Sequence, residues 1–277
     1  METIQRSDGK LVEQDPALPE KRLLTAETTD HRKWAVKRPD WWGFPEVLFG
    51  VRHGTEMFYY ALAKHNKLPM PDSQILTVNG FNCWATEFKK SRPVLGDVDH
   101  PLPGEVQSKL EKTLQNDAAQ REAYLRALFL DVMLRNFDRK VGNILKEDAG
   151  GGLALYYFDH EQSLGWRSNI QAFGRNRIKS PAEEWAEIDA NVSLERKYHW
   201  AASYSTFSER KRIFESLDLR LSMLDELEPQ IPSVGGPYPP HEKWIYADQF
   251  KDMKAGLAAW WEFLLRTPYT ALDSRLF

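Results

Sequence analysis

A stretch near the middle of the chain, residues 129–164, constrains the fold more than any other part of the sequence. It reads FLDVMLRNFDRKVGNILKEDAGGGLALYYFDHEQSL. The apolar first part predicts a helix that ends at Asn136, and the polar part after it predicts a turn that carries Asp138 and Asn143. A Gly-Gly-Gly turn and the β-rich run LALYYF then predict a hairpin whose second strand leads to Asp159. Two aspartates and an asparagine therefore follow a helix, a loop and a hairpin in a fixed order.

These three side chains suit a phosphoryl-transfer site. Such a site needs one carboxylate that orients and deprotonates the acceptor hydroxyl, and an amide oxygen with a second carboxylate that hold Mg²⁺ against the triphosphate. Asp138 fits the first role, and Asn143 and Asp159 fit the second. Each of them alone has an ordinary alternative as a turn, loop or strand-end residue, because Asp and Asn favour such positions. Their joint order favours the phosphoryl-transfer interpretation.

The motifs DRKVGN and FDHEQSL resemble the catalytic and metal-binding loops of the HipA-like kinases and, more distantly, those of the phosphoinositide kinases. The resemblance implies that Asp138 is the catalytic aspartate and that Asn143 and Asp159 bind the metal. His160 and Glu161 replace the Phe-Gly that follows this metal aspartate in ordinary protein kinases, which favours the atypical branches of the kinase fold.

The resemblance covers residues 34–164 and implies an α+β, two-lobed protein-kinase-like fold. Residues 1–20 have no period of 2 or 3.6 and are expected to form a mobile arm. Residues 21–90 are predicted to form a small β-rich N-lobe that binds the nucleotide. The Pro- and Gly-rich segment SRPVLGDVDHPLPG marks the passage into a larger helical C-lobe, residues 91–277, which carries both loops.

The run KRLLTAETTDHRKWAVKR predicts two short strands around a Thr-Thr-Asp turn. Lys37 ends the second strand, where a kinase fold holds the lysine that contacts the α- and β-phosphates. An edge-strand lysine on a solvated face is the alternative. Because no G-x-G-x-x-G precedes Lys37, the amides of the turn in residues 25–32, or the hydroxyls of Thr28 and Thr29, are the candidate phosphate ligands.

A loop is expected over PDWWGFPEVLFG and a helix over RHGTEMFYYALAKHNKLP. Glu56 is expected in the first turns of this helix. A kinase lobe uses a helix glutamate to hold the strand lysine extended, so Glu56 is the candidate partner of Lys37. The alternative is a carboxylate that is favoured near a helix N-terminus by the helix dipole.

The run SQILTVNGFNCWATEF predicts a hairpin, because Asn79-Gly80 is a strong short-range turn signal. Glu87, Phe88 and Lys89 would then form the hinge between the lobes, where backbone groups meet the adenine. An ordinary strand exit is the alternative for these three residues.

Helices are predicted over Glu105–Asn116 and Ala118–Asn136, and a wide apolar surface indicates that the second is largely buried. The basic run GWRSNIQAFGRNRIKSP stands where an activation segment would lie, with contact to an anionic group or a solvated loop as the two interpretations. Three helical segments follow, and a stiff loop, IPSVGGPYPPHEKW, separates the last two. Trp260, Trp261 and Phe263 are assigned to packing.

Composition excludes several other classes of protein. The net charge of −3 gives no global positive field that would favour nucleic acid, which leaves a local basic patch as the open alternative. The single cysteine, Cys83, and the absence of a signal peptide in METIQRSDGK favour a reducing, cytoplasmic location. The longest apolar run near the end, AGLAAWWEFLL, is too short to cross a membrane. The scattered histidines and the lone cysteine argue against a zinc enzyme or a cysteine nucleophile.

Together these features predict an ATP- and Mg²⁺-dependent kinase. The HipA resemblance implies a protein Ser/Thr acceptor, whereas the phosphoinositide-kinase resemblance implies a lipid or another small alcohol, and the sequence does not choose between them. A toxin–antitoxin role does not follow from the resemblance. Two alternatives are a non-catalytic binding protein of kinase shape and an enzyme that transfers the nucleotide instead of the phosphate.

Overall fold

The structure is a computed structural model, and it describes residues 4–5, 11–12, 24–28, 31–37, 46–78, 81–87, 92–93, 111–136, 144–149, 152–157, 160, 180–190, 201–227 and 240–277. The helices are α1 (Glu46–His65), α3 (Ala118–Met133), α5 (Pro181–Ala190), α7 (Phe207–Glu215), α8 (Ser222–Leu227), α9 (Pro240–Arg266) and α10 (Tyr269–Leu276). The strands are β1 (Ile4–Gln5), β2 (Leu11–Val12), β3 (Leu24–Glu27), β4 (Lys33–Lys37), β5 (Ser73–Val78), β6 (Phe81–Glu87), β7 (Arg92–Pro93), β8 (Ile144–Ala149) and β9 (Gly152–Tyr157). The described chain is mostly helical with a small sheet region, an arrangement compatible with the expected α+β class.

The larger sheet has six strands in the order β1-β5-β6-β4-β3-β2. All of its pairs are antiparallel except β1 with β5. The predicted hairpins β3–β4 and β5–β6 are confirmed, and Val78 pairs with Phe81 across the Asn79-Gly80 turn position. Strands β1 and β2 fall within residues 1–20, where no strand was expected, because strands of two residues are too short to produce a period.

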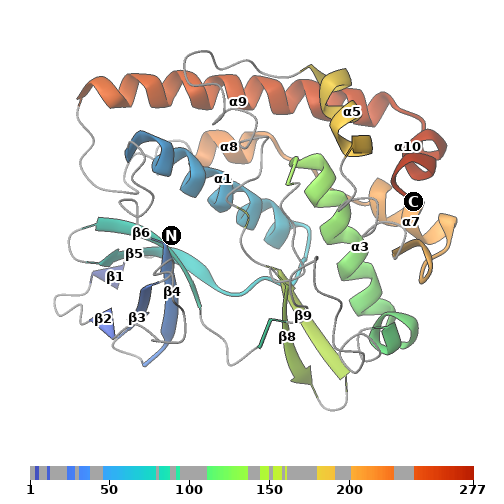
Figure 1. Cartoon of the computed structure of the whole chain (residues 1–277), viewed down its shortest axis with the longest axis horizontal. Coiled ribbons are helices and arrows are strands. Elements are labelled where there is room, and N and C mark those ends of the chain that lie inside the picture. Colours follow the sequence, from blue (N-terminus) through green and yellow to red (C-terminus); the bar gives the residue numbers. More distant parts are fainter. Residues whose placement is uncertain are drawn as a thin grey trace.

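The second sheet joins β7, β8 and β9 in antiparallel order. Its β8–β9 hairpin is the one predicted from the Gly-Gly-Gly turn, and Ala149 pairs with Gly152 beside that turn. Figure 1 shows this hairpin between the larger sheet and α3. The elements on either side of the two expected loops are therefore present in the expected order.

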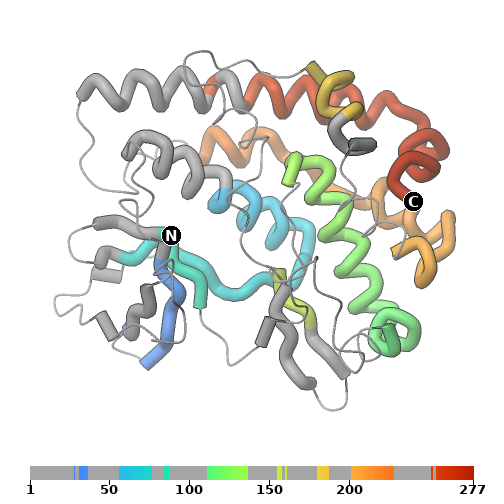
Figure 2. Tube along the Cα trace, viewed as in Figure 1, coloured from blue at the N-terminus to red at the C-terminus, as the bar shows by residue number. Residues whose placement is uncertain are grey.

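Helix α1 is longer than the sequence predicted, since it starts at Glu46 and includes EVLFG, which was expected to be loop. Gly50, which ends this part, and Gly54, in the part that was predicted as helix, each cost about 1 kcal/mol in a helix interior. Contacts of α1 with α8 and α9 stabilise the helix against that cost. Figures 1 and 2 show α1 between the larger sheet and α9.

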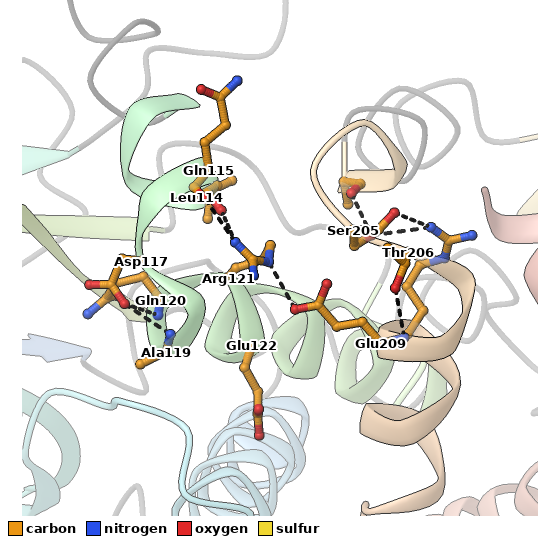
Figure 3. Close-up of polar contacts among 12 residues, drawn as sticks. Leu114, Gln115, Asp117, Ala119, Gln120, Arg121, Glu122, Ser205, Thr206 and Glu209 are labelled. Carbon is orange, nitrogen blue, oxygen red and sulfur yellow. Dashed lines mark hydrogen bonds and ion pairs between the residues drawn. The ribbon is translucent and has the colours of Figure 1, made fainter.

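The start of α3 is held by Asp117, which precedes the helix, and by Glu209 of α7 (Figure 3). Asp117 caps the helix and accepts from the backbone N–H groups of Ala119 and Gln120 at 2.9 and 3.0 Å. Arg121 Nε donates to Glu209 Oε1 of α7 at 2.9 Å. Thr206 caps α7 in turn, through a bond from the Glu209 N–H at 3.2 Å. These contacts join the start of α3 to α7.

The end of α3 is held by α9. Trp260 and Trp261 donate their indole N–H groups to the carbonyl oxygens of Val132 and Met133 at 2.9 and 2.8 Å. Such carbonyls in the last turn of a helix have no partner within the helix. Trp260 and Trp261 are buried, so their predicted packing role is confirmed.

Helix α9 also starts earlier than expected, at Pro240, so the residues PHEKW are helical and do not belong to the preceding loop. The correction has a simple cause, because proline is favoured at the first position of a helix, where no N–H bond is lost. Within the described residues, no helix combines the length and the apolar character that a membrane crossing requires.

Candidate functional site

The predicted site residues divide into two groups in the structure. Asp138, Asn143, Asp159, Phe88 and Lys89 lie outside the described residues. The remaining three are placed on the framework of the larger sheet and its helix. Lys37 is the last residue of β4, Glu56 lies in the middle of α1, and Glu87 is the last residue of β6.

The register of the sheet relates Lys37 to α1. Lys37 is the partner of Trp84 across β4 and β6, and Trp84 is the partner of Ile75 across β5 and β6. The Trp84 ring contacts the Tyr60 ring of α1 edge-on, with 5.6 Å between the centroids. Tyr60 also accepts a hydrogen bond from the Ser73 N–H at 3.3 Å. The strand position next to Lys37 is therefore packed directly beneath α1.

Glu56 lies four residues before Tyr60, so both side chains are on the same face of α1. Its side chain is buried, with 2% of the residue exposed. The helix-dipole interpretation of Glu56 was wrong, because the dipole acts within the first turn and α1 begins ten residues earlier, at Glu46. A carboxylate buried in mid-helix is costly unless a cation or hydrogen bonds compensate it.

Tyr59, next to Tyr60 on α1, contacts His160 and helix α3. Its ring stacks on the ring of His160, with 3.7 Å between the centroids and 5° between the planes. Its hydroxyl donates to Asp131 Oδ1 of α3 at 2.8 Å. The same carboxylate oxygen accepts from Asn136 Nδ2 at 2.8 Å. All four residues are buried, and together they form a network that we call the Tyr59 cluster.

Helix α3 ends immediately before the expected catalytic loop, and its end is tightly fixed. The Asn136 N–H donates to Asp131 O at 2.7 Å, and the Arg135 N–H donates to Val132 O at 3.2 Å, which is the Schellman arrangement. Arg135 has φ of 53° at the position that usually takes glycine. A non-glycine residue is strained there, so its side chain must contribute stabilising contacts.

The Arg135 side chain supplies such contacts in the core. Its Nη2 donates to Gly256 O at 2.9 Å, its Nη1 lies 3.3 Å from Glu184 Oε1, and its guanidinium lies 5.6 Å from the centre of the Trp260 ring. Burial lowers the pKa of the Arg135 guanidinium from its usual value, and the Glu184 charge acts against that shift. Arg135 thus joins the end of α3 to α5 and α9.

The open end of the β8–β9 hairpin lies beside the expected metal ligands in sequence. Ile144, the first residue of β8, is the register partner of Tyr157, the last residue of β9. The Tyr157 N–H donates to Pro69 O at 3.2 Å, which connects this end of the hairpin to the segment that follows α1.

The turn between β3 and β4 was a candidate phosphate cover, and the structure gives Thr28 a different role. The Thr28 hydroxyl accepts from Trp34 Nε1 at 3.0 Å and donates to Arg32 O at 3.1 Å, and Thr28 is buried. The turn precedes Lys33, and Lys37 is four residues further along, a distance of about 13 Å on an extended strand. The assignment of Thr28 as a phosphate ligand was therefore wrong, and Thr29 lies outside the described residues.

Glu87, at the expected hinge, is part of an ion-pair network. Arg32 donates to Glu87 Oε1 from Nε at 3.0 Å and to Asp72 Oδ2 from Nη2 at 2.9 Å. The hydrogen bond to Glu87 is the main cause of the raised pKa of Arg32. The Glu87 N–H donates to Asp72 O at 2.7 Å. The Glu87 N–H is therefore already used within the protein.

Sequence reasoning missed the Tyr59 cluster. One signal for it was present, because Asp131 is a carboxylate in the otherwise apolar run FLDVML, and a buried carboxylate requires partners. The partner Tyr59 is 72 residues away and leaves no pattern in the sequence. Within the described residues, no three His, Cys, Asp or Glu side chains gather into a metal site.

Two solved structures show weak similarity to this chain. No family model matches the chain, and no curated protein matches it. The chain is similar to the Helicobacter pylori proinflammatory kinase CtkA at a TM-score of 0.41 and 12% identity, over 83% of this chain and 92% of that one. It is similar to an aminoglycoside phosphotransferase from Alicyclobacillus acidocaldarius at a TM-score of 0.27 and 12% identity, over 86% and 90% of the two chains. At these TM-scores neither similarity decides a function, so the proposed function rests on the residues of this chain.

Proposed function

We propose that this chain is an ATP- and Mg²⁺-dependent phosphotransferase of HipA-like type that transfers the γ-phosphoryl group to a hydroxyl, most directly that of a protein serine or threonine. The Tyr59 cluster carries the proposal. Asn136 precedes Asp138 by two residues, and His160 directly follows Asp159. Since consecutive Cα atoms are about 3.8 Å apart, we infer from these contacts that both loops start close to one turn of α1.

The hairpin supports the same arrangement for the metal ligands. Asn143 directly precedes Ile144, and Asp159 follows Tyr157 by two residues. Because Ile144 and Tyr157 are register partners, we place Asn143 and Asp159 at one end of the β8–β9 hairpin. An amide and a carboxylate oxygen are hard ligands of the kind that Mg²⁺ prefers. The donor set of this chain therefore fits the metal.

We assign Lys37 and Glu56 to the nucleotide side of the proposed site. Residues paired across antiparallel strands share a face of the sheet, so we place Lys37 on the face of Trp84, which α1 covers. The face of α1 above Trp84 includes Glu56 one turn before Tyr60. A buried carboxylate that faces a strand lysine matches the pair that holds nucleotide phosphates in kinases.

Each residue then has one role in the proposed reaction. The Asp138 carboxylate orients the acceptor hydroxyl and takes its proton. Asn143 and Asp159 hold the metal, and Lys37, braced by Glu56, aligns the phosphates. When bound, ATP would supply the γ-phosphoryl group and leave as ADP, and Mg²⁺ would supply positive charge that stabilises the transfer.

The direct test is stabilisation of the protein by Mg²⁺ and ATP together. A ligand that binds only the folded state adds about 2.7 kcal/mol at 100 times its Kd, which raises the melting temperature by several degrees. ATP with Mg²⁺ is expected to raise Tm more than either alone. Asp159→Asn is expected to lose most of this shift, because it removes a charged metal ligand.

A transfer assay accompanies the melting measurement. Mass analysis of the modified product distinguishes addition of a phosphate from addition of a nucleotide. If neither ATP nor GTP with Mg²⁺ moves the wild-type transition at millimolar concentration, the phosphotransferase proposal fails. Binding without transfer to any acceptor would instead support a nucleotide-binding protein of kinase shape.

The proposed pair of Lys37 and Glu56 predicts a specific kinetic pattern. Lys37→Met is expected to raise the KM for ATP and to lower kcat, and Glu56→Gln is expected to act in the same direction more weakly. Their combined effect should be smaller than the sum by at least about 0.5 kcal/mol in a double-mutant cycle, the lower end for residues in contact. Lys33→Met, at an exposed position on the same strand, is the matched control and should change neither constant. If the effects of Lys37→Met and Glu56→Gln simply add, the two residues do not interact and the proposed pair is wrong.

A further inference from the structure

The Tyr59 side chain on α1 is linked to both segments that lead to the proposed catalytic and metal loops. Its ring and its hydroxyl make different contacts. The ring stacks on His160, which directly follows Asp159. The hydroxyl binds Asp131, which binds Asn136, and Asn136 precedes Asp138 by two residues. One side chain thus connects to the metal loop through its ring and to the catalytic loop through its hydroxyl.

The geometry of these contacts leaves little freedom. The two rings are nearly parallel, at 5°, and the hydrogen bonds that the Asp131 carboxylate accepts from Tyr59 and Asn136 are both 2.8 Å. A buried carboxylate that accepts bonds from two elements fixes their separation, because loss of either bond leaves a costly uncompensated group. Asp131 has this position, because it accepts one bond from Tyr59 of α1 and one from Asn136, three residues beyond the end of α3.

We propose that Tyr59 is a positioning residue that sets the spacing between the general base Asp138 and the metal ligand Asp159. The inference rests on the proposed phosphotransferase function and deepens it. Tyr59 touches no reacting atom and acts through Asn136 and His160. Its position three residues after Glu56 also links the spacing of the two loops to the helix that braces Lys37.

The two contacts of Tyr59 predict two separable defects. Tyr59→Phe removes the hydroxyl and keeps the ring, so it should misplace Asp138 and leave the metal loop in place. We expect kcat to fall roughly 10- to 100-fold, the scale of a displacement near 1 Å, while the KM for Mg²⁺-ATP stays within about twofold. Tyr59→Leu removes the ring stack as well and should also raise that KM and the Mg²⁺ concentration that the reaction requires.

A second tyrosine provides a matched control for a purely structural effect. The Tyr269 hydroxyl donates to Asp273 Oδ1 at 3.0 Å, so it too is a tyrosine bonded to a buried aspartate. This bond joins residues within α10. Tyr269→Phe should lower Tm, because the hydrogen bond to Asp273 is lost. It should leave kcat and KM at their wild-type values.

Asn136→Ala tests the same link from its other end. It should lower kcat as Tyr59→Phe does, and the double variant should be little worse than either single one, because both substitutions break one chain of bonds. Multiplied effects would show that the two residues act separately and would overturn the inference.

The remaining outcomes separate the inference from the proposed function. If the wild-type protein transfers phosphate and Tyr59→Phe matches Tyr269→Phe in kcat, Tyr59 is a packing residue and only the inference fails. If Tyr59→Phe lowers kcat and raises the KM for Mg²⁺-ATP as much as Tyr59→Leu does, the division between ring and hydroxyl is wrong. If the wild-type protein neither binds Mg²⁺-nucleotide nor transfers phosphate, the proposed function fails and the inference fails with it.

Discussion

Asp138→Asn is expected to abolish phosphoryl transfer while leaving the binding of Mg²⁺-ATP nearly intact. An amide in place of the carboxylate cannot accept the proton of the acceptor hydroxyl, and loss of a general base typically costs about 10²- to 10⁴-fold in rate. In the proposed reaction this side chain acts on the acceptor and makes little contact with the triphosphate. Turnover should therefore fall to the detection limit, whereas the rise of Tm with Mg²⁺-ATP should persist.

The same chemical change elsewhere controls for nonspecific effects. Asp117→Asn alters an exposed aspartate at the start of α3, and asparagine caps a helix as well as aspartate does, so its stability and activity should stay at the wild-type level. Retained turnover in Asp138→Asn would remove Asp138 from the mechanism. Loss of the Mg²⁺-ATP shift in that variant would show that Asp138 binds the nucleotide and would reassign its role.

The order of elements was predictable because it rests on local patterns. Asn79-Gly80 fixes a hairpin by its turn geometry, and it occurs as expected between β5 and β6. The Gly-Gly-Gly turn does the same for β8 and β9. Both helix errors arose from residues that are usually read as loop signals. The part of α1 that was expected to be loop ends with Gly50, and α9 begins with Pro240.

The site was less predictable than the fold because it depends on register and on distant partners. Thr28 was a reasonable phosphate ligand by composition, yet its hydroxyl is used by Trp34 within the hairpin. Glu56 was placed near a helix end, and only the full extent of α1 shows that it lies in the middle. The stacking of Tyr59 on His160 joins segments that no local pattern relates. Long-range contacts of this kind are decided by packing.

Arg135→Ala is expected to be the most destabilising single substitution proposed for this chain. Removal of one partner from a buried ion pair typically costs about 3 to 5 kcal/mol, because the other charge is left in the core. Arg135 and Glu184 are both buried, and the substitution also removes the bond to Gly256 O and the contact with Trp260. The free energy of unfolding, measured by denaturant titration, should fall by this amount with the m-value unchanged.

Two further variants separate the side-chain contribution of Arg135 from its backbone strain. Arg135→Gly loses the same contacts but relieves the left-handed conformation at φ of 53°, so it should be less destabilising than Arg135→Ala by about 1 kcal/mol. Arg266→Ala removes an exposed ion pair with Glu262 on α9 and should cost at most about 1 kcal/mol. If Arg135→Ala costs no more than Arg266→Ala, the buried pair does not hold the end of α3. The catalytic loop would then depend on the Asp131–Asn136 bond and the two indole bonds for its position, and Asn136→Ala would become the more destabilising change.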